Sequence, residues 1–282
     1  MRIVNLIENT DGGKGCVFEH GLSFYIETEK HKLLVDTGAS DAFIQNAEKL
    51  GIDLTKVDLV VLSHGHYDHA GGIMEFAGRN AKASIYMQKN AGNGYYHKSA
   101  QTEKYIGIDP NIIMLPQVVL VDGDLKIDSE LFLFSGVTER RLFPDGNLEL
   151  KYKKEDSFVQ DNFSHEQYLV ISGENKHILV SGCAHNGILN ILEKYRSIYG
   201  GNPDVVISGF HMRKKNGYSD GDVAIMKETA EELKKTETIY YTGHCTGEYP
   251  YEVMKSILGE QIVYVHSGDE IAIDNFWYKE YR

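Results

Sequence analysis

The chain has 282 residues, of which 42% are hydrophobic, and a formal net charge of −12 from 29 basic and 41 acidic side chains. A surface this acidic repels nucleic acid, and no apolar run approaches the roughly 20 residues of a membrane span, so we expect neither partner. The three cysteines are odd in number and far apart, which excludes a disulfide scaffold and favours a reducing, cytoplasmic setting.

The predicted elements alternate between short strands and helices along the chain. Apolar runs predict strands at 2–8, 22–27, 32–36, 57–63, 83–87, 117–121, 131–135, 168–172, 177–181, 204–208, 238–242 and 262–266. Helices are predicted near 40–50, 70–77, 187–199, 220–235 and 249–258. Asp220 and Asp222 are candidate N-caps of the fourth helix. Because no linker, repeat or low-complexity tract interrupts this order, we expect one layered α/β domain over residues 1–282.

The least regular part of the chain runs from about residue 89 to 165. Three stretches within it, 90–94, 136–141 and 151–156, are predicted to be loops. Loops on a rigid scaffold often carry substrate recognition, and a solvated surface insertion is the equal alternative. We expect this segment to be a loop-rich insertion that covers the substrate.

The most informative stretch is 63–69, Ser-His-Gly-His-Tyr-Asp-His, which follows a predicted strand. Imidazole nitrogen and carboxylate oxygen are ligands of zinc, iron and manganese. His64 and His66 share one side after a strand or in an extended turn, whereas on a helix they would point about 200° apart. Asp68 and His69 are adjacent and diverge, which suits a second ion beside the first. The stretch predicts a metal site rather than a polar loop with coincidental histidines.

Three further histidines, His185, His211 and His244, each follow a predicted strand and a glycine. Strand ends on one edge of a sheet converge in space, so this repeated order predicts that the three side chains meet the first cluster. We expect His185 and His244 to be metal ligands. His211 is either a further ligand or a catalytic residue that contacts substrate or protonates a leaving group.

The pattern His-x-His-x-Asp-His, followed by the small residues 70–72, resembles the signature of the metallo-β-lactamase superfamily. The stretch 33–38 is similar to the early strand and aspartate loop of that superfamily. The resemblance implies an αββα sandwich with a dinuclear metal site at one edge of the sheets. The blocks 182–188, 209–211 and 243–247 resemble a narrower branch, which contains the dihydropterin–aminobenzene-phosphate synthases of methanopterin assembly and many bacterial metal-dependent hydrolases.

The resemblance also raises an ambiguity around the third ligand of the first ion. Typical members have a histidine before a strand–turn–strand unit and a bridging aspartate after it. In this register His165 takes the histidine position and Cys183 the aspartate position, whereas the branch pattern favours His185. We choose His185 and expect Cys183 to lie beside the metal or bind it weakly, since a thiolate is a good zinc ligand. No carboxylate is evident as a bridge, so one ion or two remains open.

Two acidic residues are candidates for orienting the site. The resemblance implies that Asp36 accepts the outer N–H of a ligand histidine, which fixes its tautomer. A turn-forming role in Asp-Thr-Gly is the alternative for Asp36. Glu166, next to His165, is a candidate for orienting a ligand or the substrate.

The predicted ligands are His64, His66, Asp68, His69, His185 and His244. They would hold two divalent ions, zinc first, with manganese or iron as alternatives. We expect a metal-dependent hydrolase that attacks a small anionic ester, above all a phosphate ester, with a metal-activated hydroxide, using Asp68 and His211 as catalytic residues.

The sequence is also compatible with three other functions. One is a transferase that displaces pyrophosphate from a pterin-methyl diphosphate with an arylamine phosphate. The others are a non-catalytic metal-containing ligand-binding protein and an iron redox enzyme. The natural substrate and the oligomeric state do not follow from the sequence.

Overall fold

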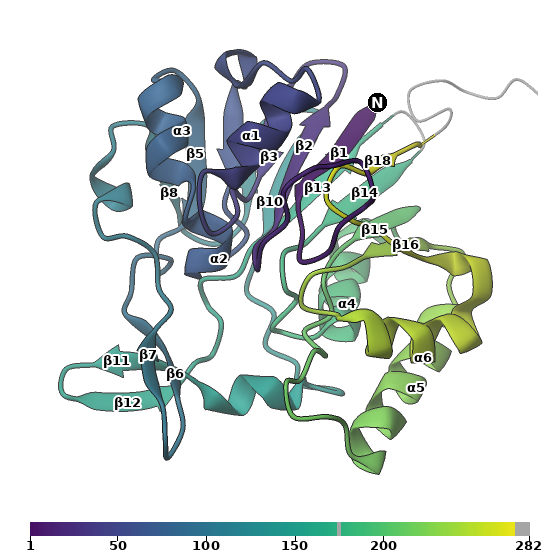
Figure 1. Ribbon diagram of the computed structural model, residues 1–282. Helices are drawn as coiled ribbons and strands as arrows, with labels where there is room; N and C mark the ends of the chain where they lie inside the picture. Colours follow the sequence, from purple (N-terminus) through teal and green to yellow (C-terminus); the bar gives the residue numbers. More distant parts are fainter. Residues whose placement is uncertain (174–175, 274–282) are drawn as a thin grey trace, which may run out of the picture.

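Two stacked sheets with helices on their outer faces form the body of the protein in the computed structural model, which describes residues 1–173 and 176–273 (Figure 1). The first sheet has the strand order β18-β1-β2-β3-β4-β5-β8, and the second has the order β17-β16-β15-β14-β13-β10-β9. This is the predicted αββα sandwich, because each sheet buries one face against the other sheet and one against helices.

The first sheet comprises β1 (Arg2–Ile7), β2 (Ser23–Glu27), β3 (Lys32–Val35), β4 (Leu59–Val61), β5 (Ser84–Gln88), β8 (Val118–Val121) and β18 (Glu270–Ile271). The strands from β3 to β8 run parallel, while β18, β1, β2 and β3 pair antiparallel. The helices α1 (Ala42–Lys49) and α3 (Ile73–Arg79) contribute Phe43 and Phe76 to the core on the outer face of this sheet. The short helix α2 (Tyr67–Ala70) lies in the connection from β4 to α3.

The second sheet comprises β9 (Leu125–Lys126), β10 (Leu131–Phe134), β13 (Tyr168–Ser172), β14 (His177–Val180), β15 (Val205–Ile207), β16 (Ile239–Thr242) and β17 (Ile262–Tyr264). The strands from β14 to β17 run parallel. The helices α4 (Ile188–Tyr199), α5 (Asp220–Lys234) and α6 (Glu248–Leu258) lie on its outer side, at the lower right of Figure 1. The described residues also form the 3₁₀ turns η1 (Leu54–Lys56), η2 (Ile112–Met114), η3 (Asp145–Glu149) and η4 (Gly259–Gln261).

Alternation along the strands divides the core into layers. In β14, Ile178 and Val180 pack against the first sheet, whereas Leu179 packs under the outer helices. In β4, Leu59 and Val61 face the second sheet and Val60 faces the helices. Both faces of these strands are buried, so they read in the sequence as continuous apolar runs.

A third, four-stranded antiparallel sheet projects from the sandwich within the irregular segment, at the lower left of Figure 1. Its strands are β6 (Tyr95–Lys98), β7 (Glu103–Tyr105), β11 (Leu150–Lys154) and β12 (Ser157–Gln160). The prediction of a loop at 151–156 is therefore wrong for residues 151–154. This charged stretch shows little of the apolar alternation of a half-buried strand, and it forms one because it pairs with β6 and β12.

The twelve predicted strands and five predicted helices are confirmed, apart from details of their ends. The predicted helix 70–77 is divided at Gly71, where a Cβ would lie 2.2 Å from the carbonyl oxygen of Ala39. Asp220 and Asp222 are not N-caps, because Ser219 caps α5. Its hydroxyl accepts from the Asp222 N–H at 3.2 Å while the Asp222 carboxylate accepts from the Ser219 N–H at 2.8 Å. None of the described helices has the length and apolarity needed to cross a bilayer.

Candidate metal centre

The predicted ligands gather at the edge where the parallel strands of both sheets end. The stretch 63–69 follows β4, and the loops carrying His185, His211 and His244 follow β14, β15 and β16. Positive φ angles occur in three of these loops, at Ala184 (52°), His211 (51°) and His244 (52°), and also at Asp36 (61°), directly after β3. Such conformations are uncommon outside glycine and cluster at functional sites.

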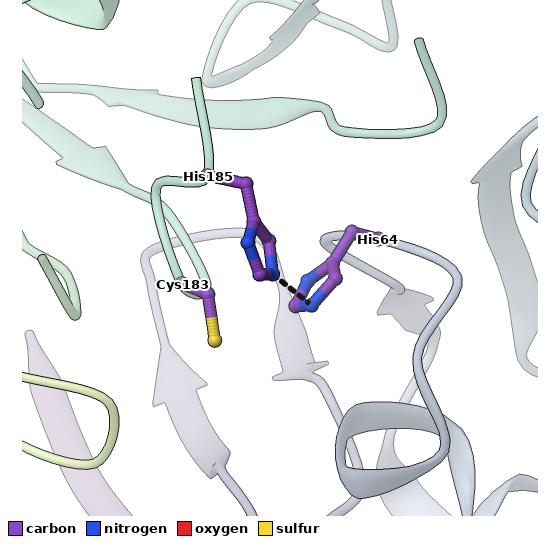
Figure 2. Close-up of side chains that lie close together, drawn as sticks. All are labelled: His64, Cys183 and His185. Carbon is purple, nitrogen blue, oxygen red and sulfur yellow. Dashed lines mark hydrogen bonds between the residues drawn. The ribbon is translucent and has the colours of Figure 1, made fainter. Parts of the chain in front are cut away.

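His64, Cys183 and His185 form the first donor group, whose possible ligand atoms all lie within 4.8 Å of one another. The Nε2 atoms of the two histidines are 3.3 Å apart (Figure 2). Two nitrogens bound to one tetrahedral zinc ion, each about 2.05 Å from it, are about 3.4 Å apart. The spacing therefore suits a pair of ligands to one ion.

His69, Cys183 and His244 form the second donor group, with the same 4.8 Å limit. Nε2 of His69 lies 3.2 Å from Nε2 of His244 and 3.2 Å from Sγ of Cys183. Asp68 borders this group, with Oδ2 3.4 Å from Nε2 of His244 and 3.8 Å from Nε2 of His69. The two groups have Cys183 in common.

A partner holds the outer nitrogen, Nδ1, of each of the four histidines in these groups. The contacts are His64 to Ser63 Oγ (2.9 Å), His69 to Asp36 Oδ2 (2.6 Å), His185 to Asn147 Oδ1 (2.9 Å) and His244 to Asn9 Oδ1 (2.9 Å). These contacts orient the rings so that the Nε2 atoms face one another. Metal-bound histidines use their outer N–H in this way.

Burial determines the protonation state of three histidines at the centre. It lowers the pKa of His64 and His185 well below the usual value and that of His66 to about 3, so these rings are neutral, the form that binds metal. Burial acts in the same direction on His69, but the carboxylates of Asp36 and Asp68 outweigh it and raise the pKa of His69 to about 9. Burial opposes ionisation of Asp68, yet His69 and His244 lower its pKa.

His66 has a buried Nε2 with no hydrogen-bond partner among the described residues. Its ring centroid lies 4.6 Å from that of His64 and 4.8 Å from that of His185. A buried polar atom without a partner is unfavourable, and a bound ion would satisfy it. The orphaned nitrogen and the nitrogen, oxygen and sulfur donors around it fit divalent metal ions.

His165 lies beside His66, but the protein occupies both of its ring nitrogens. Nδ1 accepts a hydrogen bond from the Gly65 N–H at 2.9 Å, and Nε2 lies 3.1 Å from Oδ2 of Asp161. Its ring also packs 4.0 Å from that of Tyr95. His165 therefore braces the 63–69 stretch, although it forms a 4.8 Å cluster with His66 and Asp161.

Glu166 lies outside both donor groups and holds the loop that carries His185. Its carboxylate accepts hydrogen bonds from the backbone N–H groups of His185 (2.6 Å) and Asn186 (3.0 Å). The Asn186 side chain (2.8 Å) and the Tyr168 hydroxyl (2.6 Å) also donate to it. Its contact with the site runs through the backbone of His185.

His211 lies beside the first donor group, with its ring centroid 4.1 Å from that of His185. Its backbone N–H donates to Sγ of Cys245 at 3.3 Å, and its buried Nδ1 has no partner within the described part of the chain. A pocket beside it is lined by Leu142, Pro144, Asp145, Gly146, His211, Met212, Arg213, Lys214, Asp222, Ile225 and Met226. His211 can therefore meet a molecule in this pocket.

Sequence reasoning missed several residues that border the centre. His20 lies 3.4 Å from Oδ2 of Asp68 and stacks on His244, with ring centroids 5.2 Å apart. Phe163 stacks on His185 at 4.7 Å with an interplanar angle of 1°, and Asn147 contacts the same ring. No local signal identifies these residues, because each is a single residue in an irregular stretch.

The chain is similar to known proteins of one superfamily. Residues 17–143 match the family model of the metallo-beta-lactamase superfamily. The structure of Tm1679, a metal-dependent hydrolase of the beta-lactamase superfamily, aligns with a TM-score of 0.80 and 29% identity over 97% of this chain and 99% of that one.

Two similar proteins come from Methanocaldococcus jannaschii. An uncharacterized protein is 27% identical over 95% of this chain and 98% of its own. The other, 7,8-dihydropterin-6-methyl-4-(beta-D-ribofuranosyl)-aminobenzene-5'-phosphate synthase, is 28% identical over 95% of each chain.

Proposed function

This chain belongs to the metallo-β-lactamase superfamily, and we propose from that premise that it is a metal-dependent hydrolase of a small phosphate ester. The observation that carries the proposal is the pair of histidine contacts, 3.3 Å and 3.2 Å between Nε2 atoms, in two groups that meet at one residue. Such paired donors suit two neighbouring ions, zinc first and manganese or iron as alternatives.

The proposed ligands divide between the two ions. His64, His66 and His185 hold one ion, and Asp68, His69 and His244 hold the other. Two bound divalent ions supply Lewis acidity, which activates water and stabilises charge on an ester oxygen. Asp68 borders the second group and is the proposed base that orients the attacking water. His211, beside the first group, is the proposed donor of a proton to the leaving group.

The pocket next to His211 supports an anionic substrate. Arg213 lines it, and no carboxylate within 4.0 Å pairs with this guanidinium in the described residues. The neighbouring Lys214 is already paired with Asp222. An unpaired arginine is well suited to a phosphate group because its planar fork donates two parallel hydrogen bonds.

We also propose that the chain is one domain in which the segment 89–165 covers the substrate. Two of its residues support this role, because Asn147 contacts His185 from η3 and Leu142 begins the lining of the pocket. Segments that both orient a ligand and line a pocket are common places for specificity.

The test is hydrolysis of bis(p-nitrophenyl) phosphate by protein loaded in turn with zinc, manganese or iron, with bound metal measured by mass spectrometry. We expect metal-dependent turnover in the wild type and its loss in His64→Ala, because that variant lacks a ligand of the first ion. His97→Ala is the matched control, since His97 lies on the projecting sheet, is partly exposed and pairs with Glu149 of η3. Turnover that survives His64→Ala would refute the proposal.

A synthase activity is the second candidate, supported by the alignment with the dihydropterin–aminobenzene-phosphate synthase over 95% of both chains. In that case the bound ions would assist departure of pyrophosphate, and an arylamine phosphate would replace water as the nucleophile. Product analysis with a pterin-methyl diphosphate separates the two. Coupled product that forms only with the amine supports the synthase, whereas hydrolysed pterin alcohol without it supports the hydrolase. Bound metal with neither product would indicate a ligand-binding protein.

A further inference from the structure

We infer that the sulfur of Cys183 bridges the two metal ions of the centre. The inference deepens the proposed function, because it rests on the two-ion site described there. It concerns the metal centre alone and not the identity of the substrate.

The first argument is the position of Sγ between the two donor groups. Cys183 Sγ is within 4.8 Å of one ring nitrogen each of His64 and His185, and also within 4.8 Å of one ring nitrogen each of His69 and His244. It touches the second group directly, at 3.2 Å from Nε2 of His69. A thiolate about 2.3 Å and an imidazole nitrogen about 2.05 Å from one tetrahedral ion are about 3.6 Å apart, so this contact suits a shared ion.

The second argument is that no carboxylate around the site is shared by both donor groups. Asp68 groups with His20 and His244, and Asp161 groups with His66 and His165, but neither joins His64 and His185. The oxygens of Asp36 are taken up by Ser63 and His69, and those of Glu166 hold the loop after Cys183. Among the described residues, the only acidic or thiol group common to both donor groups is therefore the thiol of Cys183.

The third argument is the local backbone. Cys183 follows β14 and the glycine at 182, and the next residue, Ala184, has a left-handed φ of 52°. The turn at Ala184 brings Cys183 and His185, two positions apart, into one donor group. A left-handed alanine is unfavourable by itself, so surrounding contacts must hold it, among them the Glu166 bonds to His185 and Asn186.

The other cysteine of the site differs from Cys183 in its surroundings. Cys245 Sγ accepts the His211 N–H at 3.3 Å and groups with Cys183 and His211, but with none of the four histidines of the donor groups. Both cysteines are free and buried. Cys245 therefore serves as a matched control for a cysteine that is close to the centre without bridging it.

Bridging has a chemical consequence. Cysteine binds metal as the thiolate, so binding releases the thiol proton to solvent. A thiolate between the ions favours zinc over manganese, because sulfur is a softer donor than carboxylate. The nitrogen and oxygen donors of the stretch 63–69 alone would not favour zinc over manganese in this way.

The decisive experiment is zinc X-ray absorption spectroscopy of the fully loaded wild-type protein. A bridging sulfur contributes one sulfur neighbour per zinc at about 2.3 Å, since both ions see it, whereas a sulfur bound to one ion contributes half. We expect one sulfur per zinc. A value of one half or zero, with two ions bound, overturns the bridge and leaves the proposed hydrolase standing.

Variants provide an independent measurement. In Cys183→Ser we expect the second zinc ion to bind at least about tenfold more weakly, because losing a direct ligand exceeds the usual effect of an outer contact. Cys183→Asp should keep two ions but lose the zinc–sulfur signal and, in cobalt-loaded protein, the thiolate charge-transfer band. Cys245→Ser should keep both signals.

The outcomes separate the two proposals. A sulfur signal that persists in Cys183→Asp and disappears in Cys245→Ser would assign the ligand to Cys245 and overturn the inference. A bridged wild-type centre without turnover on any phosphate ester would refute the proposed hydrolase while supporting the bridge.

Discussion

Oδ2 of Asp36 lies 2.6 Å from Nδ1 of His69, and both side chains are completely buried. The opposite nitrogen of the same ring faces Cys183 and His244 in the second donor group. The pair thus joins the end of β3 to the metal centre through one imidazole. Asp36 has a φ of 61°, a conformation that asparagine tolerates, so the carboxylate can be replaced without changing the backbone.

We predict that Asp36→Asn weakens zinc binding by about 10–100-fold, because the amide no longer fixes the His69 tautomer or raises its basicity. Competition with a chromophoric chelator measures the change. Asp128→Asn is the matched control, since it removes a carboxylate 2.7 Å from Nε2 of His31, away from the centre. Equal zinc affinity in both variants would contradict a role for Asp36 in orienting the ligand.

Alanine variants of His185 and His165, the two candidate ligands of the first ion, are expected to have opposite effects on metal binding. His185→Ala should lose bound metal with a small change in the stability of the metal-free protein. His165→Ala should retain metal and lower the free energy of unfolding by about 1–3 kcal/mol, because the buried Gly65 N–H and Asp161 carboxylate lose their partner. Metal analysis and urea unfolding test both. Loss of metal in His165→Ala alone would reverse the assignment.

Glu166→Gln tests the loop that carries His185. The carboxamide nitrogen cannot accept a hydrogen bond, so at least one of the donors that meet at Glu166 loses its acceptor. We expect the free energy of unfolding to fall by about 1–3 kcal/mol and the affinity for the first ion to fall with it. Tyr168→Phe is the control, because it removes one hydroxyl donor and leaves both backbone contacts. Unchanged metal affinity in Glu166→Gln would show that the loop holds His185 without the carboxylate.

His31 predicts a pH dependence of stability at the opposite edge of the sheets. Burial alone would lower its pKa, but contacts of 2.7 Å to Asp128 and 3.1 Å to Asp58 raise it. A folded pKa above the unfolded value of about 6.5 means that this stabilisation is complete below that pH and is lost as the pH rises through the folded pKa.

Because these carboxylates are partly exposed, we expect His31→Gln to lower the free energy of unfolding by about 1 kcal/mol or less at acidic pH and by less at alkaline pH. Urea unfolding of metal-free wild type and variant across this range measures the difference. A difference that does not change with pH would refute the assignment of the shift to His31.

The local sequence pattern was sufficient to predict most of the helices and strands. The buried strands read as apolar runs because both of their faces pack, and the helices α1, α4 and α6 show apolar residues at helical spacing. The stretch 63–69 concentrates histidines and an aspartate within seven residues, so its chemistry is visible before any folding. The repeated strand–glycine–histidine order identified residues that the structure does bring to one edge.

Tertiary structure decided what depends on partners distant in sequence. The charged strand β11 forms only because β6 and β12 supply its hydrogen bonds. His165 and His185 are rival candidates for one ligand position in the sequence, but Gly65 and Asp161 occupy the nitrogens of His165, while Nε2 of His185 remains directed at His64. His20 has no motif around it and reaches the centre through the fold of its loop.

Cys183 shows most clearly what the sequence determines and what only the tertiary structure determines. The resemblance to the superfamily assigns Cys183 to the position of an aspartate, and it lies 114 positions from His69 in the sequence. The stacking of the two sheets brings the ends of β4, β14 and β16 to one edge, and only there does a single sulfur come within reach of four imidazoles. Periodicity and residue type specify which elements form and which chemistry they carry. Distances between those elements arise from the packing of the whole core, which local spacing does not encode.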